Sequence, residues 1–380
     1  MTKKIAILTQ PLITNFGGTL QAYALQKKLD DMGYVVETIN FQYREMSCIN
    51  KVLSTLKNLF IRGKKVIHFT VKEKNIIKSK HTSFIQKNIK YSREFKDKLD
   101  LKKYFETENF DAVIVGSDQV WRVAYSPNIE LFFLDFLEEN KIIRKIAYSA
   151  SFGIDTWQFI GTQNEKIKSL IKQFDSISVR EINAVKLCND YWEVNVDHTL
   201  DPTLLLCKND YNNLVDKANI INNENTGIFC YILDNNKNKL NIINYIENIL
   251  NKKSFYVKSV KQDKNSFIIN NYDDYIIPSI EDWLNAFINA DFIVTDSFHG
   301  TVFSIIFNKP FISIVNIERG GSRFYSLLGE LNLLDRMVNK IEDITPDLIN
   351  SNINFEEVHK ILNKLREDSI NYLNSSLEGL

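Results

Sequence analysis

The residue with the clearest potential for chemistry is His299, in the segment Ala290–Ile314, which reads ADFIVTDSFHGTVFSIIFNKPFISI. An apolar run breaks at Thr295-Asp296-Ser297 and resumes after Gly300, a pattern that predicts a buried strand, a tight turn, a helix and a second buried strand. In open α/β sheets, ligands bind just beyond the carboxyl ends of strands, which is where this pattern places His299. A histidine there can accept or donate a proton near neutral pH. The alternative is a structural histidine in a helix-capping turn, and position alone does not decide between the two.

The residues on either side of His299 suit a ligand site. Gly300 lets the backbone approach a ligand closely, and the helix that follows points its first amides at the same place. Ser297 supplies a hydroxyl in the turn. We therefore take Ser297 and Gly300, together with His299, as candidate site residues.

A second candidate loop precedes the helix predicted over Thr19–Met32. It contains Asn15, Gly17 and Gly18, at a helix N-terminus where free amides and the helix dipole favour an anion or a sugar hydroxyl. The dinucleotide-binding pattern GxGxxG is absent, and two glycines in a turn are more often only a turn.

Two further turns follow predicted strands. Gly116-Ser117-Asp118 comes after the strand Asp111–Val115 and looks like the counterpart of the turn before His299. Arg180 ends the strand Asp175–Arg180, and Glu181 opens a helix. A lone arginine at such a place is often part of a structural ion pair, with Glu181 or Asp175 as the partner.

The elements that must position these residues alternate between strands and helices along both halves of the chain, which predicts parallel sheets. We expect an α/β fold of two Rossmann-like domains that face each other across a cleft. The N-terminal domain is predicted over residues 1–207, with a basic helical insertion near 51–103. The C-terminal domain is predicted over 208–380, with a last helix at about 354–373 packing across the junction. The polar, Asn-rich stretch 208–225 suits an interdomain connection.

Composition excludes several classes of protein. The 380 residues carry 47 Lys plus Arg and 47 Asp plus Glu, so no global charge favours nucleic acid as a partner. The four cysteines have no CxxC spacing and no close pairing with histidine, so neither a zinc site nor a disulfide framework is indicated. The N-terminus continues directly into a strand pattern, and no apolar stretch reaches transmembrane length. A cytoplasmic enzyme or binding protein is the expectation.

One region departs from this even balance. Residues 51–103 contain 14 Lys and 2 Arg against 4 acidic residues, a net charge of +12. A solvated helical surface is the simpler interpretation. The functional alternative is docking on an anionic membrane, at its inner face, or on a phosphate-bearing substrate.

Taken together, the motifs resemble those of the polysaccharide pyruvyl transferase family from end to end of the chain. The matching segments are Asn15-Phe16-Gly17-Gly18 with Leu20–Leu25 behind it, Gly116–Trp121, Ser178–Glu181, Leu200–Thr203 and Asp296–Gly300. None is decisive alone, but they occur in the family's order.

The resemblance implies a glycosyltransferase-B-like fold, no metal and no cofactor, and transfer of a pyruvyl group from phosphoenolpyruvate. The acceptor would be two hydroxyls on one sugar of a cell-surface glycan or a lipid-linked oligosaccharide, giving a cyclic ketal and phosphate. Phosphoenolpyruvate is a compact trianion, and Arg180 resembles the family arginine that would bind it with a planar, bidentate guanidinium. His299 would move a proton between the sugar hydroxyl, the enol carbon and the leaving phosphate.

The chain departs from the family pattern just before the histidine. Many members have Arg-Leu where this chain has Ser297-Phe298, so one positive charge is missing. Arg319 and Arg323, in a glycine-rich loop, could restore it, and Lys309 is a further candidate. Two other functions stay open: a nucleotide-sugar glycosyltransferase of the same fold, and a non-catalytic glycan-binding protein.

Overall fold

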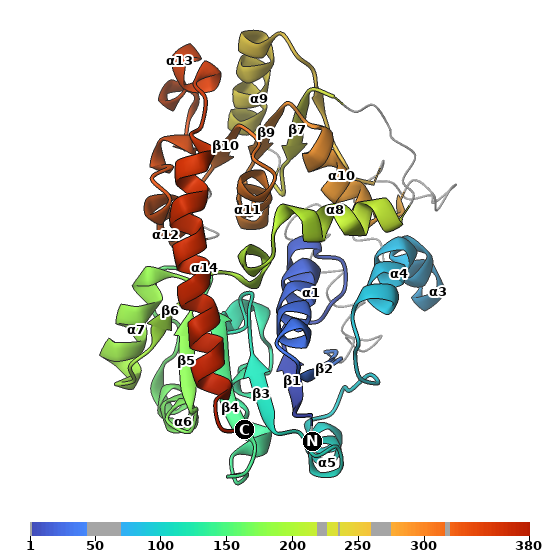
Figure 1. The fold of residues 1–380 in the computed structure, drawn as a ribbon, viewed down its shortest axis with the longest axis vertical. Helices are drawn as coiled ribbons and strands as arrows, with labels where there is room; N and C mark the ends of the chain where they lie inside the picture. The colour runs from blue at the N-terminus through green and yellow to red at the C-terminus, as the bar shows by residue number, and fades with distance from the viewer. Residues whose placement is uncertain (1, 44–69, 219–225, 235, 260–274, 316–319) are drawn as a thin grey trace, which may run out of the picture.

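The computed structural model describes residues 2–43, 70–218, 226–234, 236–259, 275–315 and 320–380. Two all-parallel sheets organise these residues, one drawn from each half of the chain (Figure 1). We call the parts built on them the N-terminal and C-terminal lobes. This arrangement confirms the predicted α/β fold with parallel sheets.

The N-terminal sheet has six strands in the order β2-β1-β3-β4-β5-β6. Their bounds are β1 Lys4–Leu8, β2 Val35–Thr38, β3 Ala112–Val115, β4 Arg144–Ala150, β5 Ser176–Val179 and β6 Asp197–His198. The helices of this part of the chain are α1 Phe16–Asp31, α3 Val71–Ile77, α4 Ser79–Asn88, α5 Lys98–Thr107, α6 Gly161–Ile171 and α7 Ile182–Trp192.

The C-terminal sheet has five strands in the order β11-β10-β9-β7-β8. They are β7 Ile228–Tyr231, β8 Ser254–Phe255, β9 Phe292–Thr295, β10 Phe311–Ile314 and β11 Met337–Val338. The remaining helices are α8 Lys208–Lys217, α9 Lys237–Leu250, α10 Ile280–Asn289, α11 Phe298–Ile306, α12 Ser322–Glu330, α13 Pro346–Asn350 and α14 Phe355–Leu377.

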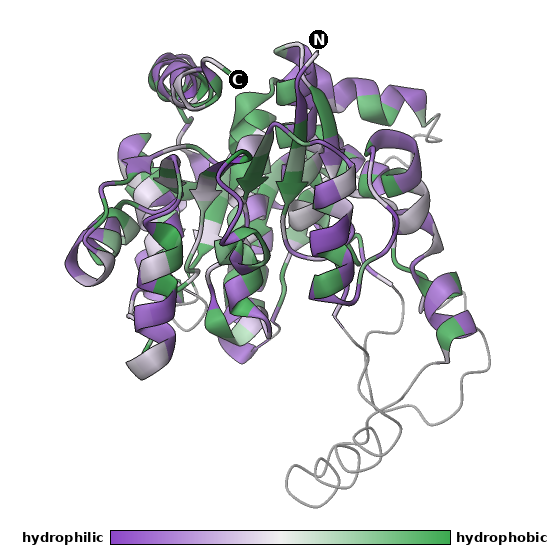
Figure 2. Ribbon diagram, turned by 90° about the horizontal axis from the view of Figure 1, so that it is seen from below, coloured by the Kyte–Doolittle hydropathy of each residue, from purple (hydrophilic) through white to green (hydrophobic). Residues whose placement is uncertain are grey.

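Both faces of each sheet are covered, which explains why the strands read as continuous apolar runs. In β1, Ile5 and Ile7 belong to one buried cluster and Ala6 and Leu8 to another, because successive side chains point to opposite faces. In Figure 2 the strands are green, whereas the surrounding helices mix green with purple. Burial of apolar side chains on both faces therefore stabilises the sheets, and the candidate site residues lie at the ends of the strands.

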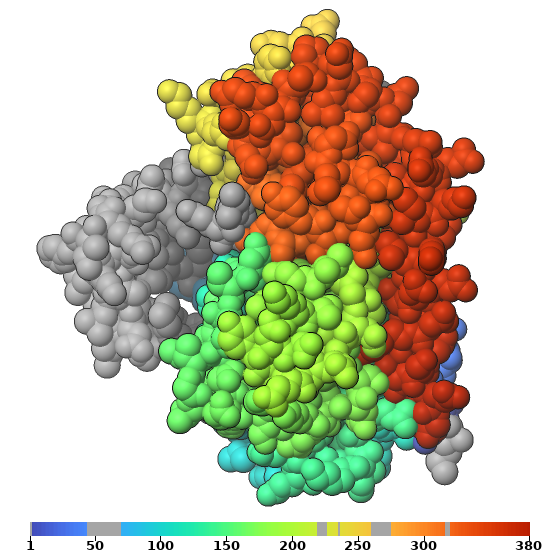
Figure 3. Space-filling model, turned by 90° about the vertical axis from the view of Figure 1, so that its left-hand side faces the viewer, coloured from blue at the N-terminus to red at the C-terminus, as the bar shows by residue number. Residues whose placement is uncertain are grey.

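Helix α14 packs against both lobes. His359, near its start, contacts Asn308 of the C-terminal lobe at 2.5 Å, while the Tyr372 hydroxyl donates to the Ala147 carbonyl of β4 at 2.8 Å. Figure 3 shows α14 in red, running along the orange C-terminal lobe and the green N-terminal lobe. The helix thereby connects the two halves along one side of the molecule.

Two local predictions need correction. Helix α1 begins at Phe16 rather than Thr19, because the Asn15 side chain accepts a hydrogen bond from the Gly18 amide and caps the helix. Gly17 and Gly18 therefore lie in the first helical turn and not in a loop. The stretch predicted as a connection after residue 207 begins with α8, which packs against α10.

The predicted basic region falls partly outside the described residues. Residues 51–69 are not described, whereas residues 70–103 contain α3, α4 and the start of α5. No helix among the described residues is both long and apolar enough to cross a membrane. Contact of this region with a membrane stays a prediction.

Candidate functional site

His299 lies in the first turn of α11, just beyond the carboxyl end of β9, and reaches the N-terminal lobe. The Ser297 hydroxyl caps this helix by accepting from the Gly300 amide at 3.4 Å. The His299 side chain is 9% exposed. Its Nε2 atom lies 3.4 Å from Oδ2 of Asp201, and a Cβ atom added to Gly17 would overlap the ring on the Nδ1 side. A histidine of one lobe is thus packed against the first turn of α1 in the other.

Two glycines make this approach possible. Gly17 leaves the space that the imidazole occupies, and its backbone has no unusual torsion, so the requirement is one of room. A Cβ atom added to Gly300 would overlap the Thr295 side chain, so this glycine lets α11 start close to β9. Both glycines were predicted to serve the ligand, and in the structure both make room for protein atoms.

Arg180 follows β5 and is almost fully buried, with a side chain that is 2% exposed. Its Nη1 donates to Oδ2 of Asp201 at 2.8 Å. Among the described residues, its Nε and Nη2 atoms have no hydrogen-bond partner. Burial disfavours the charged guanidinium, but the negative charges of Asp201, Glu181 and Asp118 outweigh it and raise the pKa of Arg180. The sequence proposed Glu181 or Asp175 as its ion-pair partner, and Asp201 is the partner instead.

Asp201 joins the two candidate residues. Its Oδ2 atom contacts both Arg180 and His299, and its Oδ1 atom accepts from the amide and the hydroxyl of Thr203, at 3.0 and 2.6 Å. Burial acts to raise the pKa of Asp201, but His299 and Arg180 hold that pKa well below its usual range. The group is therefore a buried carboxylate shared by a histidine and an arginine.

Arg323 reaches the same place from the start of α12. Its guanidinium lies 5.7 Å from the centre of the Phe298 ring, and that of Arg180 lies 4.7 Å from the same ring. Burial, followed by repulsion from Arg180, lowers the pKa of Arg323 to about 10, so the side chain is charged near neutral pH. Two arginines thus flank the phenylalanine that stands beside His299.

The loop before Arg323 is seated on the N-terminal lobe. Gly320 has a φ of 92° and approaches the Gly153 carbonyl so closely that a Cβ atom would overlap it. The Ser322 amide donates to Asp155 at 3.3 Å. Arg319, the other predicted charge, lies outside the described residues.

The turn after β3 brings Asp118 to the site, while its neighbours hold the turn in place. Oδ2 of Asp118 would lie 3.1 Å from a Cβ atom added to Gly18. The Ser117 hydroxyl is bonded to the Ser149 carbonyl at 3.0 Å. Gly116 has a φ of 131° and would collide with the Tyr148 carbonyl if it carried a side chain. Gly116 and Ser117 therefore position the turn, with the Ser117 amide donating to Gln21 of α1 at 3.0 Å, and Asp118 brings its carboxylate beside Gly18.

Lys309 does not belong to the site. It precedes β10, whereas His299 follows β9, and these two strands are parallel. Lys309 therefore lies at the opposite end of the C-terminal sheet, and the prediction that it restores the missing charge is wrong.

Sequence reasoning missed three residues of the site. Asp201 was noted only as part of a motif, and Glu181 only as an ion-pair partner of Arg180. Glu181 is 1% exposed and accepts from the Ser151 hydroxyl, and its Oε2 has no partner among the described residues. Arg122 lies close enough to Arg323 to lower its pKa. The Leu200–Thr203 motif was the available signal for Asp201.

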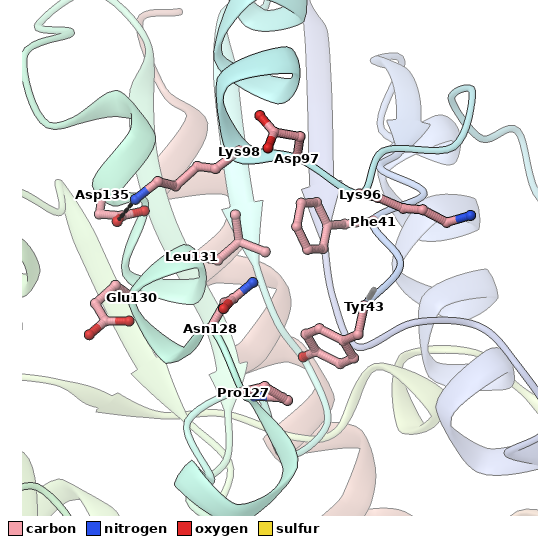
Figure 4. Close-up of a pocket in the computed structure, with 10 residues that line it drawn as sticks. All are labelled: Phe41, Tyr43, Lys96, Asp97, Lys98, Pro127, Asn128, Glu130, Leu131 and Asp135. Atoms are coloured by element: carbon pink, nitrogen blue, oxygen red, sulfur yellow. Dashed lines mark hydrogen bonds and ion pairs between the residues drawn. The ribbon is translucent and has the colours of Figure 1, made fainter. Parts of the chain in front are cut away.

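A separate pocket of about 500 Å³ lies on the N-terminal lobe (Figure 4). Phe41 and Tyr43 face Asp135 and Leu131 across it. The Tyr43 hydroxyl donates to Gln10, whose amide donates to the Gln119 carbonyl, next to Asp118. None of the site residues predicted from the sequence lines this pocket. The candidate site itself is occupied by closely packed side chains from both lobes, and the described residues contain no cluster of three or more His, Cys, Asp and Glu that could hold a metal ion.

Two parallel sheets whose strand ends meet at one buried, charged site define a protein of the glycosyltransferase-B fold class. Similar solved structures have this fold, at low sequence identity. A glycosyltransferase from Rickettsia africae matches with a TM-score of 0.54 and 11% identity over 100% of both chains. S. aureus MnaA in a co-structure with UDP matches with a TM-score of 0.51 and 14% identity, over 100% of this chain and 98% of that one.

The family model for polysaccharide pyruvyl transferases matches residues 15–318. The chain belongs to this family, which confirms the resemblance noted in its motifs and indicates a transferase. No curated protein sequence matches the chain.

Proposed function

We propose that the protein transfers the pyruvyl group of phosphoenolpyruvate onto two hydroxyls of one sugar in a cell-surface polysaccharide or its precursor. The products are a cyclic ketal and phosphate, and no metal takes part. Family membership supports the reaction class. The hydrogen bonding of the buried Arg180 guanidinium supports phosphoenolpyruvate as the pyruvyl donor.

Arg180 is the observation that carries the proposal. Asp201 holds one edge of its guanidinium, while Nε and Nη2 have no partner among the described residues. Buried donors are nearly always hydrogen-bonded in folded proteins. A planar pair of free donors fits a carboxylate or phosphate group, and phosphoenolpyruvate carries both.

Arg323 supports the same donor because it replaces the charge missing from the family motif. Phe298 stands where many members have an apolar residue, and Ser297 where they have arginine. Arg323 and Arg180 both lie over the Phe298 ring, so the second positive charge enters from α12 rather than from α11. We infer that the two guanidiniums bind the two anionic groups of the donor.

The reaction must also move two protons. When two sugar hydroxyls form bonds to the central carbon of the donor, each loses its proton. One proton ends on the methylene carbon, which becomes methyl, and the other leaves with the phosphate as the bond to the bridging oxygen breaks. We infer that His299, which contacts Asp201, takes one hydroxyl proton and returns it.

A nucleotide-sugar glycosyltransferase is the second candidate, and the similar solved structures favour it to the extent that the fold allows. A thermal-shift comparison separates the two. We expect phosphoenolpyruvate, and neither UDP nor GDP, to raise the unfolding temperature, since ligand binding to the folded state stabilises it. Stabilisation by a nucleotide alone would favour the glycosyltransferase.

The decisive experiment measures phosphate release from phosphoenolpyruvate with a galactose- or mannosamine-type acceptor, with and without a chelator. We expect release in both cases. His299→Ala should lower turnover by about 10²–10⁴-fold with donor binding nearly intact, the usual range for a general acid or base. If this variant still formed the ketal at a near wild-type rate, His299 would be a structural residue of the helix-capping turn and not a catalytic one. Glycan binding without any phosphate release would instead indicate a non-catalytic binding protein.

A further inference from the structure

Asp201 places a buried carboxylate at ion-pair distance from His299. It lies after β6, in the N-terminal half of the chain, while His299 comes from the C-terminal lobe. Its Oδ2 atom lies 3.4 Å from Nε2 of His299, and its Oδ1 atom is fixed by both donors of Thr203. The carboxylate is fully buried, and Arg180 holds its charge. The carboxylate therefore has a fixed place and a fixed ionisation state.

A fixed carboxylate determines which imidazole nitrogen carries the proton. In neutral histidine one nitrogen is a donor and the other an acceptor. Because a carboxylate is negative and only accepts, it favours the proton on the ring nitrogen that faces it, which is Nε2 here. Nδ1 is then left with its lone pair.

The environment of Nδ1 is the opposite of that of Nε2. Nδ1 lies on the side of the ring that faces Gly17, where no side chain stands. Nε2 is fully buried and makes no hydrogen bond within the described residues, so the Asp201 carboxylate 3.4 Å away acts on it through its charge. Nδ1 is not among the buried atoms that lack a partner, and no residue of the described ranges forms a hydrogen bond with it. The nitrogen that a ligand can meet is therefore Nδ1.

We propose that Asp201 is the positioning residue of His299: it holds the imidazole in the Nε2–H form, so that Nδ1, beside Gly17, is the nitrogen that exchanges protons with the substrate. In the forward reaction, Nδ1 takes the proton of a sugar hydroxyl as the oxygen bonds to the central carbon of the donor. The resulting imidazolium is stabilised by the neighbouring carboxylate and then returns that proton to the methylene carbon or to the phosphate oxygen. The assignment of the tautomer stands on geometry alone, while the identity of the proton's source rests on the proposed function.

The tautomer can be read without any substrate. The chain has five histidines, so protein labelled with ¹⁵N in histidine gives few ring signals, and the signals that disappear in His299→Gln belong to His299. We expect the wild-type protein at a pH where His299 is neutral to show a protonated Nε2 and an unprotonated Nδ1. Asp201→Asn should lose that preference, because an amide can accept from or donate to the ring. A protonated Nδ1 in the wild type, or an unchanged tautomer in Asp201→Asn, would overturn the proposal.

A pH profile gives an independent reading on the active enzyme. In Asp201→Asn, turnover should fall by at least about 10²-fold, as expected when the wrong tautomer prevails. The acid limb of the profile should move to lower pH, because the imidazolium loses its neighbouring negative charge. A uniform loss with an unmoved acid limb would indicate a merely structural role. If the tautomer is as assigned but no phosphate is released, the proposed function fails and the positioning role stands.

Asp201→Asn leaves Arg180 buried without its partner, and that can prevent folding. A matched pair keeps the test intact in that case. Arg180→Met and the double variant Arg180→Met/Asp201→Asn both lack the arginine charge, and they differ only in the carboxylate. The Nε2–H form should prevail in the first and not in the second. The same tautomer in both would overturn the proposal.

Discussion

Two buried ion pairs lie at the carboxyl ends of the two sheets, and they differ in the hydrogen bonds that their side chains make. Arg180 and Asp201 are 2.8 Å apart, Lys239 and Asp296 are 2.5 Å apart, and all four side chains are at most 5% exposed. The Lys239 ammonium also donates to the Asp234 carbonyl, and Asp296 accepts from the amides of Leu233 and Asp234. The first pair contacts His299 across the lobes and keeps two guanidinium donors without a partner in the described part of the chain.

The comparison shows that burial and charge do not identify a functional pair. A buried ion pair whose hydrogen-bond partners all belong to one lobe can hold a turn of that lobe. Lys239–Asp296 does this for the turn that carries His299. A pair with unused donors beside a titratable side chain is prepared for a ligand. The two turns that look alike in sequence thus have different roles, since Asp118 lies beside α1 while Asp296 is turned into its own lobe.

The largest effect should come from breaking the pair whose hydrogen-bond partners among the described residues all lie within the C-terminal lobe. Lys239→Met leaves Asp296 buried without its cation, which should lower the free energy of unfolding by about 3–5 kcal/mol. Urea unfolding measures this. The double variant Lys239→Met/Asp296→Asn should recover part of the loss, because the uncompensated charge is gone. A Lys239→Met protein of wild-type stability would contradict the role assigned to this pair.

Arg180→Lys tests the other pair. The ammonium keeps the charge near Asp201 but loses the planar fork, so the donor should bind more weakly and turnover should fall, each by roughly 10-fold or more. Stability should change less than in Lys239→Met. Kinetics with varied phosphoenolpyruvate, together with urea unfolding of the same protein, separate the two effects. A loss of stability without a change in donor KM would place Arg180 with Lys239, as a residue of the fold.

Arg323→Ala sharpens the comparison by removing a charge that faces the same ring. If Arg323 supplies the charge missing beside Ser297-Phe298, the KM for phosphoenolpyruvate should rise by about 10-fold, in line with loss of one charge-assisted contact. Titration of donor binding by thermal shift provides a second measurement. Unchanged donor binding would assign that charge to Arg319.

Much of the fold was predictable because apolar runs mark buried parallel strands. The sequence pattern predicts no strand at β6 or β11, each of which has only two residues. The site was predictable in its strand-end residues, Arg180 and His299. Asp201 as their shared partner was not, because its contact with His299 joins residues 98 positions apart in different lobes, and spacing along the chain carries no information about such a contact. Lys309 was misplaced for a related reason. It is only ten positions from His299 in the sequence, but helix α11 lies between them and brings Lys309 to the opposite end of the sheet.

The smallest effect should come from the ion pair between His198 and Glu330, which joins the two lobes. Nδ1 of His198, in β6, lies 3.2 Å from Glu330 of α12, and its Nε2 lies 3.0 Å from the Arg180 carbonyl. Burial acts to lower the pKa of His198, but the hydrogen bond and charge of Glu330 outweigh it, and the net pKa is raised. Because the folded state binds this proton more tightly than the unfolded state, the pair stabilises the protein at low pH. That contribution is lost as the pH rises through the raised pKa.

Glu330→Gln should therefore lower the unfolding midpoint near pH ~6 and have little effect near pH ~9, with a loss of about 1 kcal/mol for a pair whose side chains are about one fifth exposed. Urea unfolding of both proteins at the two pH values measures the difference. An equal loss at both would show that Glu330 packs against His198 without pairing with its charge.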